Sequence, residues 1–293
     1  MNFEGSFTAL VTPFRADGAL DLDALADLVE WQIESGIDGL VPTGSTGESA
    51  TLTPAEHVEV IRRVVDVAEG RVPVIAGTGS NSTQEAVDFT REARAAGADA
   101  ALLISPYYNR PTQDGIVAHY RTVASETGLP LFVYNIPGRT ASRIEPDTMA
   151  RLAATPGIVG LKEAGGDLVR SAHTIALVGD DFVVLSGDDA LTLPLLAIGG
   201  RGVITTTGNV APAEVAEITR AARAGDWEGA RAAHYRLLPL MEALFLESNP
   251  IPVKAALAIL GRIPEPTLRL PLTEISKPNR DRLEAALAGL ARA

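Results

Sequence analysis

RVPVIAGTGSNSTQEAVDFTREARAAGADAALLISP, residues 71–106, contains one complete copy of the pattern that decides the fold. An apolar run at residues 71–79 is followed by a helical segment from Thr83 and by a second apolar run at residues 98–106. Both runs are continuously apolar rather than alternating, which is typical of parallel strands covered on both faces. The stretch therefore predicts a strand–helix–strand unit of a parallel sheet.

The same unit recurs along the chain. Six further apolar runs lie at residues 6–14, 36–44, 129–137, 158–164, 182–189 and 202–209. Between runs the helical pattern is clearest after Thr53, where Pro54 and Glu56 complete the spacing of a capping box. Eight strand–helix units in about 220 residues predict an α/β fold, the (β/α)8 TIM barrel. A doubly wound sheet is the alternative, but it usually has a glycine-rich dinucleotide turn after its first strand, and TPFRADGA at 12–19 is not one.

The last part of the chain has a different pattern. Beyond residue 225 it is wholly helical, in three segments at residues 227–245, 250–261 and 273–291. We therefore expect residues 1–224 to form the barrel and residues 225–293 to form a C-terminal helical extension packed on it.

Composition limits the possible partners and chemistry. The chain has 293 residues, 46% of them hydrophobic, so it can bury a large core. It has no cysteine, which excludes disulfides, thiol catalysis and thiolate metal sites. The net charge of −12 argues against nucleic acid and anionic membranes as partners. There is no signal-peptide pattern and no apolar run near about 18 residues, so we expect a cytoplasmic protein with no membrane partner.

In a (β/α)8 barrel the chemistry lies at the C-terminal ends of the strands. Those ends carry small and hydroxyl-bearing residues and one lysine, Lys162, although only two other lysines exist in the chain, Lys254 and Lys277. A lysine in a barrel mouth loses hydration, so its pKa falls and its neutral amine can attack a ketone or aldehyde to form an imine. The alternative is a buried salt bridge from Lys162 to Glu48 or Glu163.

Other polar side chains are expected at the same mouth. Tyr134 lies one strand away and can shuttle protons during imine chemistry, and Tyr108, Ser45 and Thr46 could extend that relay. Arg139 could hold a carboxylate in a bidentate contact. The alternatives are a core tyrosine with a satisfied hydroxyl and a surface arginine.

Other chemistries have less support. No histidine lies at a predicted strand end and no two have metal-ligand spacing, which argues against a metal-dependent aldolase; the four are His57, His119, His173 and His234. Neither a Walker loop nor a GxSxG elbow occurs. The glycine-rich segment 199–202 precedes the eighth strand, so we expect a turn at the end opposite the mouth.

Six motifs together resemble the dihydrodipicolinate synthase / N-acetylneuraminate lyase family of class I aldolase-like barrels, over nearly the whole chain. In chain order they are GSTGES (44–49), PYYNRP (106–111), YNIPGRT (134–140), GLKEAGG (160–166), LSGDD (185–189) and NPIPVK (249–254). The resemblance implies an imine between pyruvate and Lys162, with Tyr134 as the proton shuttle and no cofactor. It also implies a triad of Tyr134 with Thr46 and Tyr108, in which Tyr108 comes from a neighbouring subunit of a homotetramer, a dimer of dimers.

The resemblance also points to the substrates. The substrate-binding set is expected to be Thr46, Arg139, Ile204 and Gly187, with Ile204 contacting pyruvate through its backbone. Arg139 matches the family's synthases, which implies condensation of pyruvate with L-aspartate 4-semialdehyde to 4-hydroxy-tetrahydrodipicolinate in the diaminopimelate route to lysine. Ser45 departs from the two threonines most common in those enzymes. A related 2-keto acid aldolase, such as an N-acetylneuraminate or 2-keto-3-deoxy-sugar-acid lyase, is therefore the alternative, and a non-catalytic metabolite sensor is a further rival.

The resemblance implies a regulatory site as well. Family members that are inhibited by L-lysine bind it between subunits, at positions matching Ala50, His57, Gly79, Asn81, Glu85 and Tyr107. The alternative is that His57 and Glu85 are solvated helix residues. Pro54 stands where some sensitive enzymes have a histidine, so partial inhibition is expected.

Overall fold

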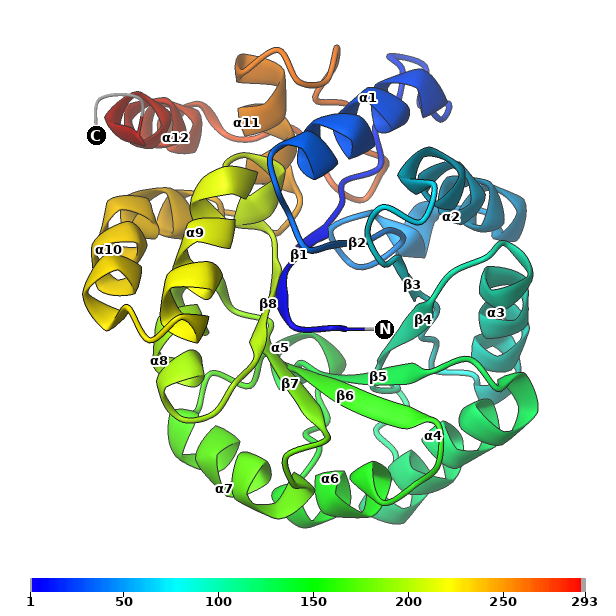
Figure 1. Ribbon diagram of the computed structural model, residues 1–293. Coiled ribbons are helices and arrows are strands. Elements are labelled where there is room, and N and C mark those ends of the chain that lie inside the picture. The colour runs from blue at the N-terminus through cyan, green and yellow to red at the C-terminus, as the bar shows by residue number, and fades with distance from the viewer. Residues whose placement is uncertain (1, 291–293) are drawn as a thin grey trace.

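The computed structural model describes residues 2–290, and its centre is one sheet of eight parallel strands (Figure 1). The sheet order is β2-β1-β8-β7-β6-β5-β4-β3, and a parallel bridge between Leu40 and Val74 links its two outer strands. This confirms the predicted (β/α)8 TIM barrel. The strands are β1 Gly5–Ala9, β2 Gly39–Val41, β3 Ile75–Gly77, β4 Ala100–Ile104, β5 Leu131–Asn135, β6 Ile158–Glu163, β7 Val183–Ser186 and β8 Gly202–Thr205.

Each strand lies within a predicted apolar run, or within one residue of it, but most are shorter than the run. The run at 36–44, for example, contributes only Gly39–Val41 to the sheet. The remaining residues of a run leave the sheet and form loops, so apolar character extends beyond the hydrogen-bonded strand.

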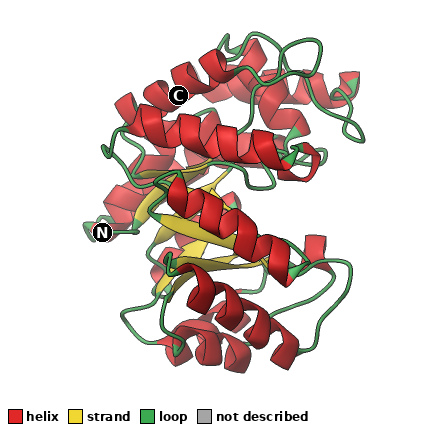
Figure 2. Cartoon of the chain, turned by 90° about the vertical axis from the view of Figure 1, so that its right-hand side faces the viewer, coloured by secondary structure: helices red, strands yellow, loops and turns green. Residues whose placement is uncertain are grey.

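Helices surround the strands on the outside (Figure 2). The capping box that opens α2 is confirmed, because Thr53 accepts from the backbone of Glu56 while the Glu56 carboxylate accepts from the backbone of Thr53. The outer helices are α1 Leu22–Glu34, α2 Pro54–Ala68, α3 Thr83–Ala95, α4 Gln113–Thr127, α6 Pro146–Ala153, α7 Leu168–Val178, α8 Thr192–Ala197 and α9 Pro212–Arg223. Short helical turns lie at η1 Ser49–Thr51, α5 Pro137–Thr140, η2 Asp189–Leu191 and η3 Thr207–Asn209.

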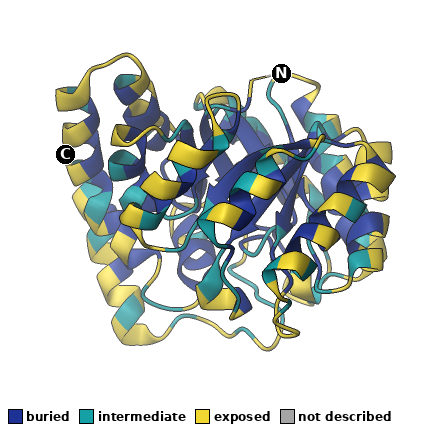
Figure 3. Ribbon diagram, turned by 90° about the horizontal axis from the view of Figure 1, so that it is seen from below, coloured by how far each residue is buried: buried dark blue, intermediate teal, exposed yellow. Residues whose placement is uncertain are grey.

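The barrel interior is a packed core rather than a channel. Phe7, Ile75, Phe132 and Leu185 fill it from four different strands. Gly160 gives Phe132 its space, since a Cβ at position 160 would lie 2.2 Å from the Phe132 ring. Figure 3 shows the strands buried and the outer helix faces exposed. A site in this fold is therefore expected at the C-terminal ends of the strands and not within the filled interior.

Three further helices pack beside the barrel, α10 Trp227–Ala243, α11 Ile251–Ile259 and α12 Lys277–Leu290 (Figure 1). Helix α10 packs on α9 and on α12. Residues of α10, α11 and α12 share one hydrophobic cluster with residues of α1 and α9. The predicted extension therefore exists as helices, while a division at residue 224 stays a prediction. No helix in the described part of the chain is long and apolar enough to span a membrane.

Candidate active site

Lys162 is at the C-terminal end of β6, as predicted. It is 6% exposed and pairs in register with Tyr134 on β5. Its Nζ lies 4.4 Å from the centre of the Tyr134 ring. The pKa of Lys162 is lowered to about 8, mainly because the side chain is buried. The Asp189 carboxylate opposes this change, and the Arg139 guanidinium adds to it. The amine is therefore available in its neutral form to a much greater extent than an exposed lysine amine.

No carboxylate binds this amine among residues 2–290. Glu48 forms an ion pair with Lys254, and Glu163 accepts from the side chain of Asn135 at 3.0 and 3.1 Å. Asp189 accepts three hydrogen bonds, from the Thr206 and Thr207 backbone and the Thr207 hydroxyl. The salt-bridge alternative for Lys162 is therefore wrong, because both carboxylates it named have other partners.

Gly187 makes room for the lysine. It follows β7 directly, and a Cβ at this position would lie 2.9 Å from both Cγ and Cε of Lys162. Its φ does not lie in the left-handed region, so the need for glycine here is steric. The structure therefore places Gly187 against the side chain of Lys162, and its role in substrate binding stays a prediction.

Tyr134 is buried at the C-terminal end of β5, beside Lys162. Burial raises its pKa, and the positive charge of Arg139 lowers it. Its hydroxyl makes no hydrogen bond within the described residues, so the alternative of a core tyrosine with a satisfied hydroxyl does not apply.

Thr46 lies in the turn after β2, and its hydroxyl is buried in a polar cluster. Its Oγ1 accepts from the Asn249 side chain at 2.9 Å and lies 3.5 Å from the Thr206 Oγ1. Asn249 and Thr206 were not among the expected site residues, and both contact the Thr46 hydroxyl. Asn249 lies 203 positions from Thr46, and only its place in the NPIPVK motif marked it. Ser45 is half-buried in the same turn.

Arg139 lies on the short helix α5, at the edge of the mouth. It is exposed, and its Nη2 donates to the backbone carbonyl of Asn249 at 3.2 Å. Its positive charge lowers the pKa of both Lys162 and Tyr134, so its guanidinium lies near these two side chains. Ile204 lies on β8 in the packed interior.

Tyr108 is not brought to the other candidates within one chain. It is 88% exposed, has φ of 70°, and makes no hydrogen bond to Thr46 or Tyr134. For a non-glycine residue this left-handed backbone conformation is uncommon. The predicted triad is therefore incomplete in a single chain.

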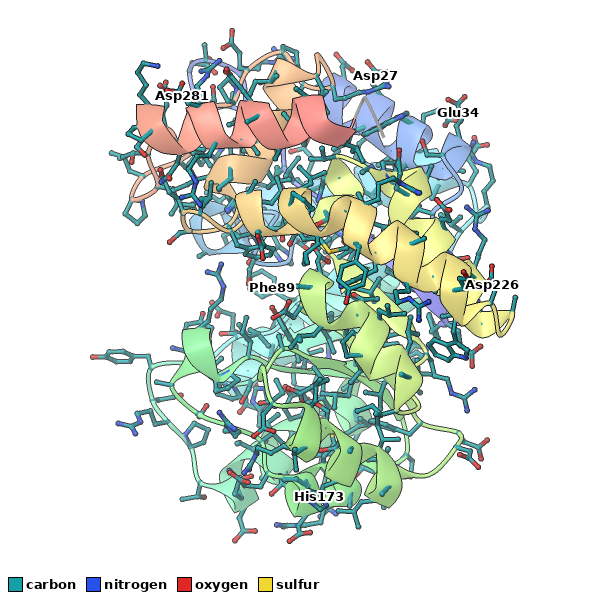
Figure 4. The ribbon with its side chains drawn as sticks, turned by 90° about the vertical axis from the view of Figure 1, so that its left-hand side faces the viewer. Asp27, Glu34, Phe89, His173, Asp226 and Asp281 are labelled. Atoms are coloured by element: carbon teal, nitrogen blue, oxygen red, sulfur yellow. The ribbon has the colours of Figure 1, made fainter. Side chains whose placement is uncertain are left out.

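The expected lysine-binding positions lie on neighbouring elements. His57 on α2 is buried, with its ring 4.4 Å from that of Phe89 on α3, so its description as a solvated residue is wrong. The pKa of His57 is lowered to about 4, mainly because the ring is buried, and the Glu85 carboxylate opposes this change. Glu85 is exposed and accepts from the Ser80 hydroxyl. His173, which had no expected role, is exposed on the outer helix α7 (Figure 4).

The other expected positions lie in loops next to these two helices. Asn81 precedes α3, and its carbonyl accepts from Asn109 at 2.8 Å, which ties the loop after β3 to the loop after β4. Gly79 is in the first of these loops, and Tyr107, 37% exposed, is in the second. Ala50 is exposed in η1.

A separate cavity of about 660 Å3 opens at the opposite end of the barrel. Gly199, Gly200 and Arg201 line it just before β8, which confirms that this glycine-rich segment lies away from the mouth.

Comparison with known proteins gives a consistent result. Residues 2–290 match the model of the dihydrodipicolinate synthetase family. The chain is 53% identical to 4-hydroxy-tetrahydrodipicolinate synthase of Nitratidesulfovibrio vulgaris (strain DP4), over 98% of each chain.

Two solved structures are similar over almost the whole chain. The chloride-inhibited dihydrodipicolinate synthase from Acinetobacter baumannii complexed with pyruvate is 44% identical, with a TM-score of 0.97 over 99% of each chain. The enzyme from Cyanidioschyzon merolae with lysine bound is 42% identical, with a TM-score of 0.95 over 99% of each chain.

Proposed function

The chain belongs to the dihydrodipicolinate synthetase family, and we propose that Lys162 is the residue through which it acts, as the amine that forms an imine with pyruvate. The protein is a lyase with the synthase activity of its relatives, condensing pyruvate with L-aspartate 4-semialdehyde. The observation that carries the role of Lys162 is its buried amine, 4.4 Å from the Tyr134 ring and without a carboxylate partner in the described chain.

The proposed reaction begins with attack of the Lys162 amine on the ketone of pyruvate, and loss of water gives the imine. Loss of a methyl proton gives an enamine, whose carbon attacks the aldehyde carbon of the second substrate. The amino group of that substrate then attacks the imine carbon, which closes the ring and frees Lys162. Tyr134 and Thr46 are proposed to move protons in these steps, with Ser45 beside them in the same turn.

A pKa near 8 helps the first step. At pH 7 about one amine in ten is neutral at that pKa, against about one in three thousand at the usual value of 10.5. Because only the neutral amine attacks a carbonyl, the surroundings of Lys162, chiefly its burial, raise the reactive fraction several hundredfold.

Arg139 is the proposed contact for the carboxylate of the second substrate. Its guanidinium lies at the mouth, near Lys162 and Tyr134, and one of its nitrogens is oriented by the Asn249 carbonyl. Gly187 and the backbone of Ile204 are the proposed pyruvate contacts, together with Thr46. The pyruvate-bound relative supports pyruvate as the first substrate.

The exposed Tyr108 supports an assembly in which this side chain enters the site of a neighbouring copy. We therefore propose a homotetramer built as a dimer of dimers, with Tyr108 completing the relay of Tyr134 and Thr46. Analytical ultracentrifugation gives the mass of the assembly, and a monomer with full activity contradicts this proposal.

L-lysine is the proposed regulator. The lysine-bound relative supports such a site, and the residues that would form it here are Ala50, His57, Gly79, Asn81, Glu85 and Tyr107. Glu85 supplies an anion for the ligand's ammonium. Glu85→Ala is expected to abolish inhibition with pyruvate kinetics nearly unchanged. Wild-type rates unaffected by millimolar lysine would refute this regulation.

Borohydride trapping tests the role of Lys162. Pyruvate with borohydride is expected to inactivate the enzyme and to add a reduced three-carbon adduct to Lys162, with Lys254 and Lys277 as internal controls. An adduct on either control lysine, or none on Lys162, contradicts the mechanism.

Kinetics with both aldehyde classes test the second substrate. Arg139→Ala is expected to lower kcat/KM for L-aspartate 4-semialdehyde about ten- to a hundredfold, since a charge-assisted contact contributes about 1.5–3 kcal/mol. Trapping of the pyruvate adduct is expected to survive. Cleavage of N-acetylneuraminate by the wild type, without semialdehyde activity, would favour the aldolase alternative.

A further inference from the structure

A second buried lysine lies outside the chemistry just described. Lys254 on α11 forms an ion pair with Glu48 at 2.5 Å, and the two side chains are 0% and 1% exposed. The Lys254 amine also donates to the Thr267 carbonyl at 2.7 Å and lies 4.0 Å from the centre of the Phe14 ring. The other carboxylate oxygen of Glu48 accepts from the backbone of Arg269 at 3.1 Å. The contacts of Lys254 with Glu48 and Phe14, and of Arg269 with Glu48, thus join the extension to the barrel.

Stability alone does not explain such a pair. Taking two charges out of water offsets most of their attraction, and well-packed apolar residues of similar size often stabilise a protein as well or better. A role in fixing geometry is the best-attested reason for a buried pair.

The backbone around Glu48 shows what geometry is fixed. Glu48 has φ of 53°, a left-handed conformation that glycine adopts without cost and that a residue with a Cβ adopts at some cost. Here the position carries a glutamate whose side chain reaches Lys254 and Arg269. The contacts of the carboxylate hold the backbone in this conformation at the end of the turn 44–48, two residues after Thr46.

The same segment of the extension holds Thr46 directly. Asn249, five positions before Lys254, donates to the Thr46 hydroxyl at 2.9 Å. Residues 249–254 therefore contact the turn at two points, the Thr46 hydroxyl and the Glu48 carboxylate. A turn held at two points by one short segment cannot shift without breaking one of the contacts.

We propose that Lys254 and Glu48 are positioning residues: their buried ion pair fixes the turn 44–48 so that the Thr46 hydroxyl is held at the barrel mouth. The C-terminal extension in this way supports catalysis, although neither Lys254 nor Glu48 contacts the substrate. The inference rests on the proposed role of Thr46 in proton transfer.

Loss of the pair is expected to act on turnover through Thr46. A displacement of a catalytic group by about 1 Å can cost about a hundredfold in rate. Lys254→Met is therefore expected to lower kcat about ten- to a hundredfold, while KM for pyruvate changes less than about threefold. Lys277→Met is the matched control, because Lys277 is exposed and, among residues 2–290, its ion pair is with Asp281 on its own helix. This variant is expected to leave kcat unchanged.

A double variant separates positioning from folding. Lys254→Met alone leaves the Glu48 charge buried, so it is expected to lower the melting temperature. Glu48→Gln with Lys254→Met removes both charges, and its melting temperature is expected to recover most of the loss while kcat stays low. Recovery of wild-type kcat together with the melting temperature would overturn the proposal, since the pair would then serve stability alone. If Lys254→Met does not fold, the double variant is used in its place.

A double-mutant cycle shows whether the effect passes through Thr46. Thr46→Val removes the hydroxyl, so adding Lys254→Met to that variant is expected to lower kcat less than about threefold further. An equal loss in both backgrounds would overturn the proposal. Failure of the proposed function is a separate result, because it appears in the wild type as the absence of a pyruvate adduct on Lys162.

Discussion

An alanine at position 187 would place its Cβ in the space that the stem of Lys162 now fills. The Cβ would lie 2.9 Å from Cγ and Cε of Lys162 and 2.9 Å from the Cβ of Ala164. Carbon atoms in favourable contact lie about 3.5–4.0 Å apart, so the neighbours must move by roughly 0.6–1 Å. Ala164 is fixed by its backbone, whereas the lysine stem is flexible. The displacement therefore falls mainly on Lys162.

This displacement sets the size of the expected effect. A shift of about 1 Å in a reacting group can cost about a hundredfold in rate. Gly187→Ala is therefore expected to slow trapping of the pyruvate adduct on Lys162 about ten- to a hundredfold. The crowding is expected to cost about 1–3 kcal/mol of unfolding free energy, which leaves the protein folded.

Mass spectrometry of the borohydride-trapped protein over time measures the first quantity, and denaturant unfolding measures the second. Gly289→Ala is the control, because position 289 lies on α12 and alanine favours a helix. No neighbouring atom of the described residues lies within 4 Å of a Cβ built there. A Gly187→Ala variant that traps pyruvate at the wild-type rate would refute the steric argument for Gly187.

Three further predictions follow from the same contacts. The rate of pyruvate adduct formation is expected to rise with pH through about 8, where Lys162 loses its proton, and a midpoint near 10 in stopped-flow trapping would contradict this assignment. Lys162→Met is expected to be more stable than the wild type below pH 8, by up to about 3 kcal/mol of unfolding free energy. That advantage is expected to shrink between pH 8 and 10.5, because in this range the folded wild type has released a proton that the unfolded chain still binds. Equal unfolding free energies of variant and wild type at pH 7 would be evidence against a buried ammonium. Asn249→Ala removes the donor to Thr46 and is expected to lower kcat about tenfold in a coupled assay, with the Lys162 adduct still formed; an unchanged kcat would mean that Thr46 needs no such donor.

The sequence predicted the features of the fold that depend on neighbouring residues in the chain. Continuous apolar runs predicted all eight strands, because a parallel sheet buried on both faces needs apolar residues at successive positions. The capping box at Thr53 and Glu56 marked the start of α2 because both hydrogen bonds join residues three positions apart. Lys162 was a candidate for a similar reason: strand ends face the mouth in this fold, and its strand could be located.

The contacts that complete the site could not be predicted in this way. Asn249 and Thr46 meet through the packing of α11 against the mouth, and no periodicity encodes a contact across 203 positions. The partner of Glu48 was also left open: the alternative considered for Lys162 named Glu48, and the fold pairs Glu48 with Lys254 instead. Which of two lysines meets a carboxylate depends on the arrangement of the extension on the barrel, and the apolar pattern leaves that open.

The two buried lysines show why position alone does not make an amine reactive. Burial lowers the pKa of each to about 8, although Glu48 opposes the change at Lys254. If Lys254 lost its proton, Glu48 would remain as an isolated buried charge. The Lys254 amine is also already paired with the Glu48 carboxylate and donates to the Thr267 carbonyl. Lys162 makes no hydrogen bond within residues 2–290, so its lone pair becomes free at little further cost. Borohydride trapping should therefore label Lys162 and spare Lys254 in the same molecule, and an equal yield at both would mean that burial, not the missing partner, determines reactivity.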